Sequence, residues 1–240
     1  MNQRNYRISL VIPAHNEEKY IGACLEHAIK NSDGKFLEII VVDNASTDRT
    51  QEIAKSFPGV KVVYEKNKSL TYARQRGFIE ASGDILAYID ADTRMPKGHY
   101  EKIVAEFNAD PDLVSYSGPH EYYDIEKSKQ VLTKLFWKIM AYPTYILVGY
   151  MTIGVNFAIK KDALIRMNGF DTSISFYGED TDIARRAHEH GKVKFSTKFG
   201  MPTSGRRLSD HGIFKSFIIY ISNFIFEVTL KRPMTKNIVT

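Results

Sequence analysis

The sequence is poor in cysteine and tryptophan, with one residue of each among 240. The single Cys24 excludes an internal disulfide and lies among apolar residues at helical spacing, which indicates a buried thiol in a reducing compartment. No G-x-G-x-x-G follows the first apolar stretch, which argues against a dehydrogenase. No Lys/Arg cluster alternates with aromatic residues, so we expect no nucleic-acid partner.

Long apolar runs are also scarce at the N-terminus. Ile8–Ile12 is too short for a signal peptide and Pro13 ends it, so we expect a cytoplasmic protein. The net charge of +5 is modest and suits a phosphate-rich ligand or an anionic membrane surface. With 43% hydrophobic residues, the chain can bury the core of one α/β domain, with or without an appendage.

Short apolar runs alternate with amphipathic stretches along most of the chain. The runs predicted as strands are Ile8–Ile12, Leu37–Val42, Val60–Tyr64, Ile85–Ile89, Leu113–Ser117 and Gly154–Ile159. A helix is expected from about Glu17 to Asn31, with Asn16 as its cap. This alternation predicts an α/β fold in which helices flank a mainly parallel sheet.

Two later regions differ in texture. Residues 119–150 are crowded with tyrosines and have weak periodicity, which fits core packing as well as an acceptor surface that stacks on sugar rings or lipid. Residues 206–240 are predicted to form a helical extension of a domain spanning 1–205. Its apolar part, 213–230, carries a polar stripe that suits an in-plane membrane helix, docking on the domain, or packing on a second copy.

The stretch most suggestive of chemistry is Tyr88–Thr93. Asp90 and Asp92 follow a predicted buried strand, where two unpaired carboxylates would each cost several kcal/mol without a cation or a donor-rich ligand. Carboxylate oxygens suit Mg²⁺ or Mn²⁺, which complete their shells with substrate phosphates. Asp43, after the second strand, and Glu179-Asp180, at a later helix start, can reach the same edge of the sheet.

With these turns in view, the sequence resembles the family 2 glycosyltransferases, whose nucleotide-sugar-binding fold is called GT-A. The matching pieces occur in the family's order and span about residues 7–200. They are Ile8–Glu18, Ile40–Asp48, Ala73–Gly77 with Gly83–Asp92, Gly154–Ile159 and Gly169–Asp180.

The resemblance implies an inverting transfer of one sugar from a nucleotide-diphosphate sugar, UDP-linked for preference, to a glycan, lipid-linked or small-molecule acceptor. It implies nucleotide-sugar contacts at Pro13, Ala14, Glu17, Asp43, Asn44, Arg74, Asp90, Ala91 and Arg206. It places a Mn²⁺ or Mg²⁺ ion on Asp92, with Asp90 and His211 as further ligands, and makes Asp180 the base that deprotonates the acceptor. Glu179 would orient the acceptor or the loop, and Arg206 or Arg207 would clamp the diphosphate.

The family's Gln-x-x-Arg-Trp signature of processive synthases is absent, so we expect single-sugar transfer rather than polymer synthesis. A sugar-nucleotide pyrophosphorylase is an alternative, but it would need a Gly-rich basic loop where this chain has Pro13–Asn16. A catalytically silent binding module is a second alternative, against which Asp90, Asp92 and Asp180 argue. Membrane contact through 213–232, at the inner face of the membrane, and a homo-oligomer complete the expected partners.

Overall fold

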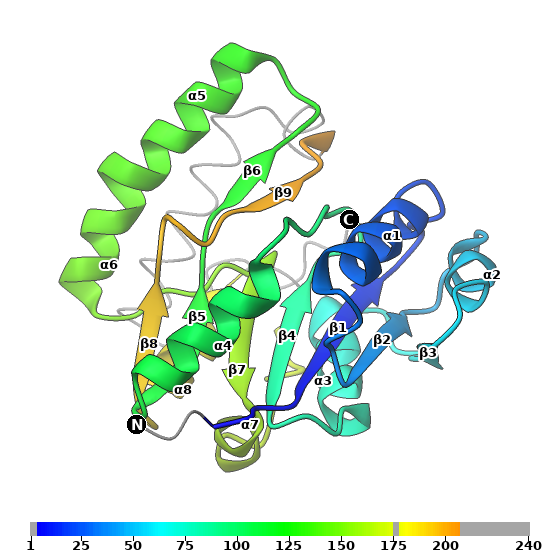
Figure 1. Ribbon diagram of the computed structural model, residues 1–240, viewed down its shortest axis with the longest axis horizontal. Helices are drawn as coiled ribbons and strands as arrows, with labels where there is room; N and C mark the ends of the chain where they lie inside the picture. Colours follow the sequence, from blue (N-terminus) through cyan, green and yellow to red (C-terminus); the bar gives the residue numbers. More distant parts are fainter. Residues whose placement is uncertain (1–3, 175–177, 207–240) are drawn as a thin grey trace.

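A computed structural model describes residues 4–174 and 178–206 of the chain. Within that part, seven strands form one sheet in the order β3-β2-β1-β4-β7-β5-β8 (Figure 1). They are β1 (Ile8–Ala14), β2 (Glu38–Asp43), β3 (Val60–Tyr64), β4 (Ile85–Ile89), β5 (Leu113–Ser117), β7 (Asn156–Lys160) and β8 (Lys192–Phe195). Only β7 runs antiparallel to its neighbours among these pairs. The predicted α/β fold with a mainly parallel sheet is confirmed.

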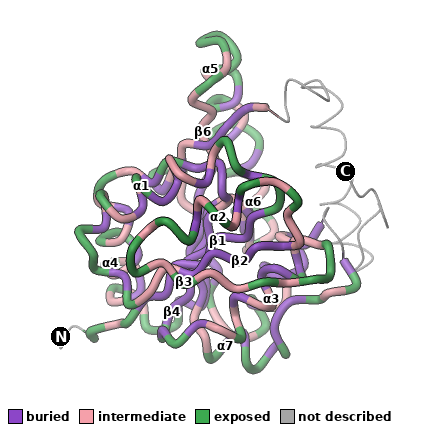
Figure 2. Tube along the Cα trace, turned by 90° about the vertical axis from the view of Figure 1, so that its right-hand side faces the viewer, coloured by how far each residue is buried: buried purple, intermediate pink, exposed green. Residues whose placement is uncertain are grey.

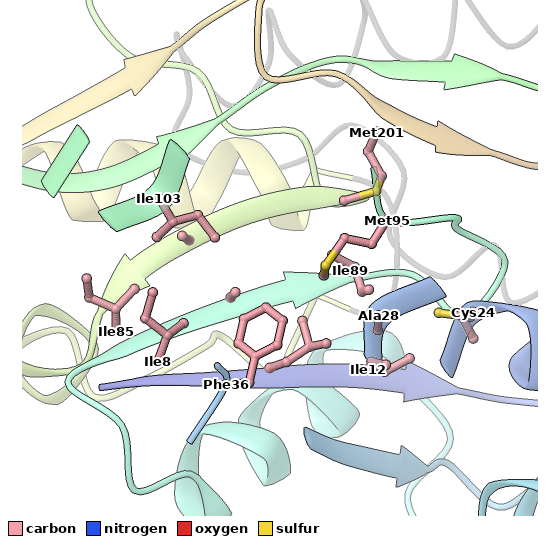
Figure 3. Close-up of a cluster of buried hydrophobic side chains, with 14 of the residues drawn as sticks. Ile8, Ile12, Cys24, Ala28, Phe36, Ile85, Ile89, Met95, Ile103 and Met201 are labelled. Atoms are coloured by element: carbon pink, nitrogen blue, oxygen red, sulfur yellow. The ribbon is translucent and has the colours of Figure 1, made fainter. Parts of the chain in front are cut away.

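Both faces of the sheet are covered by helices, which explains why a central strand such as β4 is a continuous apolar run. The helices are α1 (Ile21–Ser32), α2 (Thr50–Lys55), α3 (Leu70–Glu80), α4 (His99–Ala109), α7 (Lys161–Arg166) and α8 (Glu179–His188). Side chains of α1, α2 and α4 bury one face, where Ile8 and Ile12 of β1 meet Ala28 and Ile103 (Figure 3). Val11 points to the opposite face, which α3, α7 and α8 cover.

The first helix begins later than predicted. It starts at Ile21, and Asn16 does not cap it but has a left-handed backbone with φ 54°. The Asn16 side chain instead accepts a hydrogen bond from the backbone N–H of Thr47 at 2.8 Å. The segment from His15 to Tyr20 is therefore a loop tied to the turn after β2, because Asn16 bonds across to that turn rather than along a helix.

A smaller unit extends from the main sheet. Strands β6 (His120–Tyr122) and β9 (Met201–Thr203) pair in parallel. They come from distant parts of the chain, because β6 follows β5 and β9 follows β8. The aromatic region, whose sequence has weak periodicity, is helical from residue 127 to residue 148. It forms α5 (Lys127–Phe136), a π-helical turn η1 (Trp137–Ala141) and α6 (Tyr142–Val148). Figure 2 shows α5 projecting from the rest of the domain.

Candidate active site

Asp92 lies where β4 leaves the sheet, and the small sheet holds it in place. Its Oδ1 accepts a hydrogen bond of 2.9 Å from the hydroxyl of Thr203, which belongs to β9. A backbone bridge between Thr93 and Thr203 joins the same two segments. The Asp92 side chain is only 9% exposed and that of Asp90 is 21% exposed, so both carboxylates are largely withdrawn from bulk water.

Arg206 links Asp92 to the loop after β1. Its guanidinium lies 3.3 Å from Asp92 Oδ2 and forms an ion pair with Glu17. The same guanidinium stacks over the ring of Tyr20, 4.6 Å from its centroid. Burial alone would lower the pKa of Arg206, but the hydrogen bond to Glu17 and the charges of Glu17 and Asp92 raise it above its usual value. Residues from three distant segments therefore meet at one charged cluster.

Arg74, one of the expected nucleotide-sugar contacts, occupies a second cluster beside the first. It is 1% exposed and lies in an ion pair with Glu179. It also donates a 2.8 Å hydrogen bond to the carbonyl of Gly154 and lies 3.7 Å from Asp90. The guanidinium therefore ties α3, β4 and α8 together.

The chain passes so close to this pair at residue 154 that only glycine fits. A Cβ there would lie 2.8 Å from the Arg74 Nη2 atom and 2.8 Å from the Glu179 carboxylate. Both of those atoms are buried, so they cannot move aside into solvent. Gly154 thus contributes to the site because it has no side chain and leaves room for the Arg74–Glu179 ion pair.

Asp180 sits in the first turn of α8, next to Glu179. Its Oδ1 accepts a 2.9 Å hydrogen bond from the backbone N–H of Thr181. Burial raises the pKa of Asp180, and Arg74 together with backbone N–H groups of Thr181 and Gly154 opposes the rise. Burial likewise raises the pKa of Glu179 above its usual range, with Arg74 limiting the increase. The pair thus holds carboxyl groups whose pKa values are shifted toward neutral pH.

Asp43 and Ala14 lie at the matching ends of adjacent strands, because Ala14 pairs with Asp43 in the β1–β2 register. Asp43 accepts hydrogen bonds from the Ser46 backbone at 3.2 Å and from the Gln51 side chain at 3.0 Å. Pro13 precedes Ala14 at the same edge. These residues therefore share the carboxyl edge of the sheet with Asp90, which follows the neighbouring β4.

Asn44 and Ala91 do not present free side chains at this edge. The Asn44 amide donates to the carbonyls of Glu65 and Asn67 at 3.2 and 2.7 Å and accepts from the Ser69 backbone at 2.9 Å. Both amide hydrogens are thus used to hold the loop before α3. The Ala91 methyl group packs in the main core, so only its backbone can face a ligand.

Two residues near Asp92 were absent from our predictions. Thr203 anchors the Asp92 carboxylate, and the hydroxyl of Tyr123 donates to the Asp92 carbonyl at 3.3 Å. Arg94 stacks on the Tyr123 ring at 3.9 Å. Thr203 lies 111 residues from Asp92, and no local pattern in the sequence signals their contact.

The carboxylates at the end of β4 fit a divalent cation. Among residues 4–174 and 178–206, no group of three or more His, Cys, Asp or Glu side chains could surround a metal ion. Asp90 and Asp92 supply two carboxylates, and Mg²⁺ or Mn²⁺ is commonly held by one or two carboxylates with water and substrate phosphates. His211, the predicted further ligand, and Arg207 lie outside the described residues.

Comparison with known proteins decides the family. The family model for glycosyl transferase family 2 matches residues 9–171. The chain belongs to this family. A curated member, the dolichol-phosphate mannosyltransferase of Pyrococcus furiosus, is 35% identical over 112 residues, which are 45% of this chain and 32% of that protein. The predicted membership of a family of transferase enzymes is confirmed.

Solved structures of other glycosyltransferases share the fold. The mannosyltransferase of Pyrobaculum calidifontis, solved with GDP-Man and Mn²⁺, superposes with a TM-score of 0.68 at 20% identity, covering 95% of this chain and 64% of that one. The glucosyl-3-phosphoglycerate synthase of Mycobacterium tuberculosis, solved with Mn²⁺, UDP and phosphoglyceric acid, gives 0.61 at 22% identity, covering 93% and 78%. The GT-A fold of this family 2 chain is thereby confirmed.

The family 2 chain is shorter than its curated relatives. The matches cover between 17% and 47% of the lengths of eight curated glycosyltransferases. Among the described residues, no helix is both long and apolar enough to cross a bilayer.

Proposed function

We propose that this chain transfers one sugar from a nucleotide-diphosphate sugar to an acceptor hydroxyl with the help of a divalent cation. The observation that supports the proposal is the convergence of Asp90 and Asp180 on the buried Arg74, because Asp90 is the proposed metal ligand and Asp180 the proposed base. Family membership supports the reaction class. The Mn²⁺ and nucleotides named with the two solved relatives support the donor class.

Asp92 and Asp90 would hold the cation, with His211 as a further ligand. When bound, the cation neutralises charge on the departing diphosphate. Thr203 fixes one oxygen of Asp92 and leaves the other toward Arg206, so the carboxylate is oriented before any ligand arrives. We propose that Arg206 turns from Asp92 to the diphosphate when the donor and the cation bind.

Asp180 would act as the general base. The acceptor oxygen forms a bond to the anomeric carbon while the bond from that carbon to the diphosphate oxygen breaks, and its electron pair leaves with the diphosphate. The acceptor proton passes to the Asp180 carboxylate. Attack opposite the leaving group inverts the anomeric carbon. Glu179 would position this machinery, because its carboxylate is held by Arg74 directly beside Asp180.

The nucleotide would lie along the ends of β1 and β2, against Pro13, Ala14, Glu17 and Asp43. UDP is the preferred nucleotide. Asn44 and Arg74 also belong to the proposed ligand set, and their polar groups bond to neighbouring parts of the protein in the structure. The backbone of Ala91 would contribute a contact between the two aspartates.

The acceptor would be a glycan, a lipid-linked sugar or a small molecule. We further propose that 1–205 is the catalytic domain and that 206–240 contacts the inner face of the cytoplasmic membrane through 213–232. A second copy of the chain is the other partner proposed for this extension, which lies outside the described residues beyond Arg206.

The pH dependence of turnover should reveal the base. Asp180 must be deprotonated to accept a proton, and its pKa is raised by burial above the ordinary value of 3.8. Turnover should therefore fall as the pH drops through that raised pKa, so the acid limb should lie above the ordinary value of 3.8. A profile of the turnover number at saturating donor checks this, and an acid limb at or below the ordinary value would contradict it.

Asp92→Ala should weaken metal-dependent donor binding at least tenfold, because it removes the carboxylate proposed as the main metal ligand. Calorimetry of UDP binding with and without Mn²⁺ measures the effect. Asp112→Ala, in an exposed loop, is the matched control and should bind as the unaltered protein does. Equal Mn²⁺-dependent binding by the Asp92 variant would remove Asp92 from the metal site.

The first experiment is a thermal-shift panel of UDP-, GDP- and dTDP-sugars with Mn²⁺, followed by release of nucleoside diphosphate in the presence of candidate acceptors. Stabilisation by a nucleotide sugar that depends on Mn²⁺, together with sugar transfer, supports the proposal. Release of pyrophosphate from a nucleoside triphosphate would indicate a pyrophosphorylase instead. Binding without any turnover, across acceptors of all three classes, would indicate a silent module.

A further inference from the structure

The segment 127–148, made of α5, η1 and α6 and here called the arm, has an inner face that packs on the domain. Thr133, Trp137 and Ala141 recur at spacings of four residues on this face and are buried. Trp137 and Ala141 join Met151 and Phe195 in a separate small core. The arm is therefore attached through this face, and Phe136 and Tyr145 also pack against the small core.

The outer face of the arm is apolar where a water-exposed helix is usually polar. Eight of the thirteen large hydrophobic side chains that are exposed among the described residues lie on these 22 residues. They are Val131, Leu132, Leu135, Ile139, Met140, Tyr142, Ile146 and Leu147. Five of them, at 131, 135, 139, 142 and 146, are three or four residues apart and form one stripe, and Leu147 is 88% exposed. A contiguous patch of this kind marks an interaction surface.

The charge of the arm has one sign. It contains Lys127, Lys129, Lys134 and Lys138 and no Asp or Glu. Lys127 precedes Val131 by one helical turn and Lys138 directly precedes Ile139, so these two cations border the apolar stripe. The other two lysines pair with carboxylates outside the arm, Lys134 with Glu121 at 3.0 Å and Lys129 with Glu126 at 3.4 Å. Long lysine side chains can extend from an apolar surface to reach anionic groups around it.

We propose that the arm docks on an anionic lipid surface, with its apolar stripe among the headgroups and its lysines on lipid phosphates. A basic amphipathic helix with aromatic and aliphatic residues on its other face is the chemistry that such a surface binds. A second copy is less suited, because a two-fold contact would set these lysines against themselves. Residues 213–232 of the same chain also carry a basic excess, Lys215, Lys231 and Arg232 against Glu227, so their charge does not complement that of the arm.

The arm is mechanically connected to the candidate site. Helix α5 packs on β6, which pairs with β9, and Thr203 of β9 holds Asp92. Docking of the arm would therefore place the site close to the lipid surface, where an acceptor carried by lipid is presented. This inference goes beyond the proposed function and does not depend on the roles proposed for Asp92 or Asp180.

Vesicle flotation with the full chain tests the inference. Vesicles of phosphatidylcholine alone are compared with an equal mixture of phosphatidylcholine and phosphatidylglycerol. We expect binding to the mixture, weakened by salt, and a loss of about tenfold or more for the triple variant Ile139→Gln/Ile146→Gln/Leu147→Gln. The control is Ile79→Gln/Ile165→Gln, since Ile79 on α3 is as exposed as Ile146, at 64%, but lies outside the arm. The control should bind as the unaltered chain does.

A milder variant covers the case in which the triple variant does not fold. Lys127→Gln/Lys138→Gln alters only exposed side chains and should weaken binding to the anionic vesicles about fivefold for each lysine. Unchanged flotation of the folded triple variant, or of the lysine variant, would overturn the inference and assign any membrane contact elsewhere. Absence of flotation by the unaltered chain, with a dimer in light scattering that the triple variant loses, would overturn it in favour of a second copy.

Discussion

Asp180→Asn should lower the turnover number by about 10²- to 10⁴-fold, the usual contribution of a general base, while donor affinity changes little. The amide keeps the size of the side chain and an oxygen that can still accept the Thr181 N–H at 2.9 Å, so the start of α8 should be preserved. What is lost is the carboxylate that we propose receives the acceptor proton. Steady-state kinetics with saturating donor and acceptor, and calorimetry for donor binding, separate the two quantities.

The control for this substitution is Asp112→Asn, which makes the same chemical change in an exposed loop and should leave turnover unaltered. The acid limb of the pH profile should disappear with Asp180, because the residual reaction no longer titrates with that carboxyl group. An unchanged turnover number for Asp180→Asn would exclude Asp180 as the base. A loss of donor binding as large as the loss of turnover would show that Asp180 acts in binding rather than in proton transfer.

The sequence predicted the strands well because a parallel sheet covered on both faces needs apolar runs. Leu37–Val42 and Ile85–Ile89 are such runs, and they appear as β2 and β4 with nearly the same bounds. The direction of β7 could not be predicted, because an apolar run looks the same in a parallel and an antiparallel strand. The start of α1 was misplaced because asparagine is a favoured helix-capping residue. In the fold, the Asn16 side chain instead accepts a hydrogen bond from Thr47 in the turn after β2, a contact that the local sequence does not reveal.

The residues of the candidate site also fall into two groups, those placed by local sequence and those whose contacts depend on tertiary packing. Asp90, Asp92, Glu179 and Asp180 follow strands or open a helix, so local sequence places them at the functional edge. The environment of Arg74 depends on Gly154 and Glu179, which lie 80 and 105 residues away. Whether Arg74 faces a ligand or is buried therefore depends on tertiary packing that no local motif encodes. The same holds for Asn44, whose partners Asn67 and Ser69 lie in the loop before α3.

The burial of Arg74 leads to the second large effect. Arg74→Met should lower the free energy of unfolding by about 3–5 kcal/mol, the usual cost of removing one partner from a buried ion pair. Glu179 would be left without its counter-charge, and Asp90 would lose a guanidinium at 3.7 Å. Urea unfolding without ligand measures the change. Arg76→Met, on the same helix but with a more exposed side chain paired to Glu80, is the matched control and should cost no more than about 1 kcal/mol.

The destabilisation should depend on pH in a defined direction. Burial raises the pKa of Glu179 in the folded protein above its ordinary value of 4.5, and Arg74 opposes that rise. Without Arg74 the folded-state pKa rises further, so the folded protein binds a proton that the unfolded chain releases. The cost of Arg74→Met should therefore be greatest above the folded-state pKa and should shrink as the pH falls toward 4.5.

A double substitution separates the ion pair from mere packing. Glu179→Gln added to Arg74→Met removes the uncompensated charge, so the double variant should regain part of the lost stability and should lose most of its excess pH dependence. A cost for Arg74→Met that stays constant with pH and is not relieved by Glu179→Gln would mean that Arg74 acts through the volume it fills. In that case the coupling of α3, β4 and α8 would rest on packing rather than on charge.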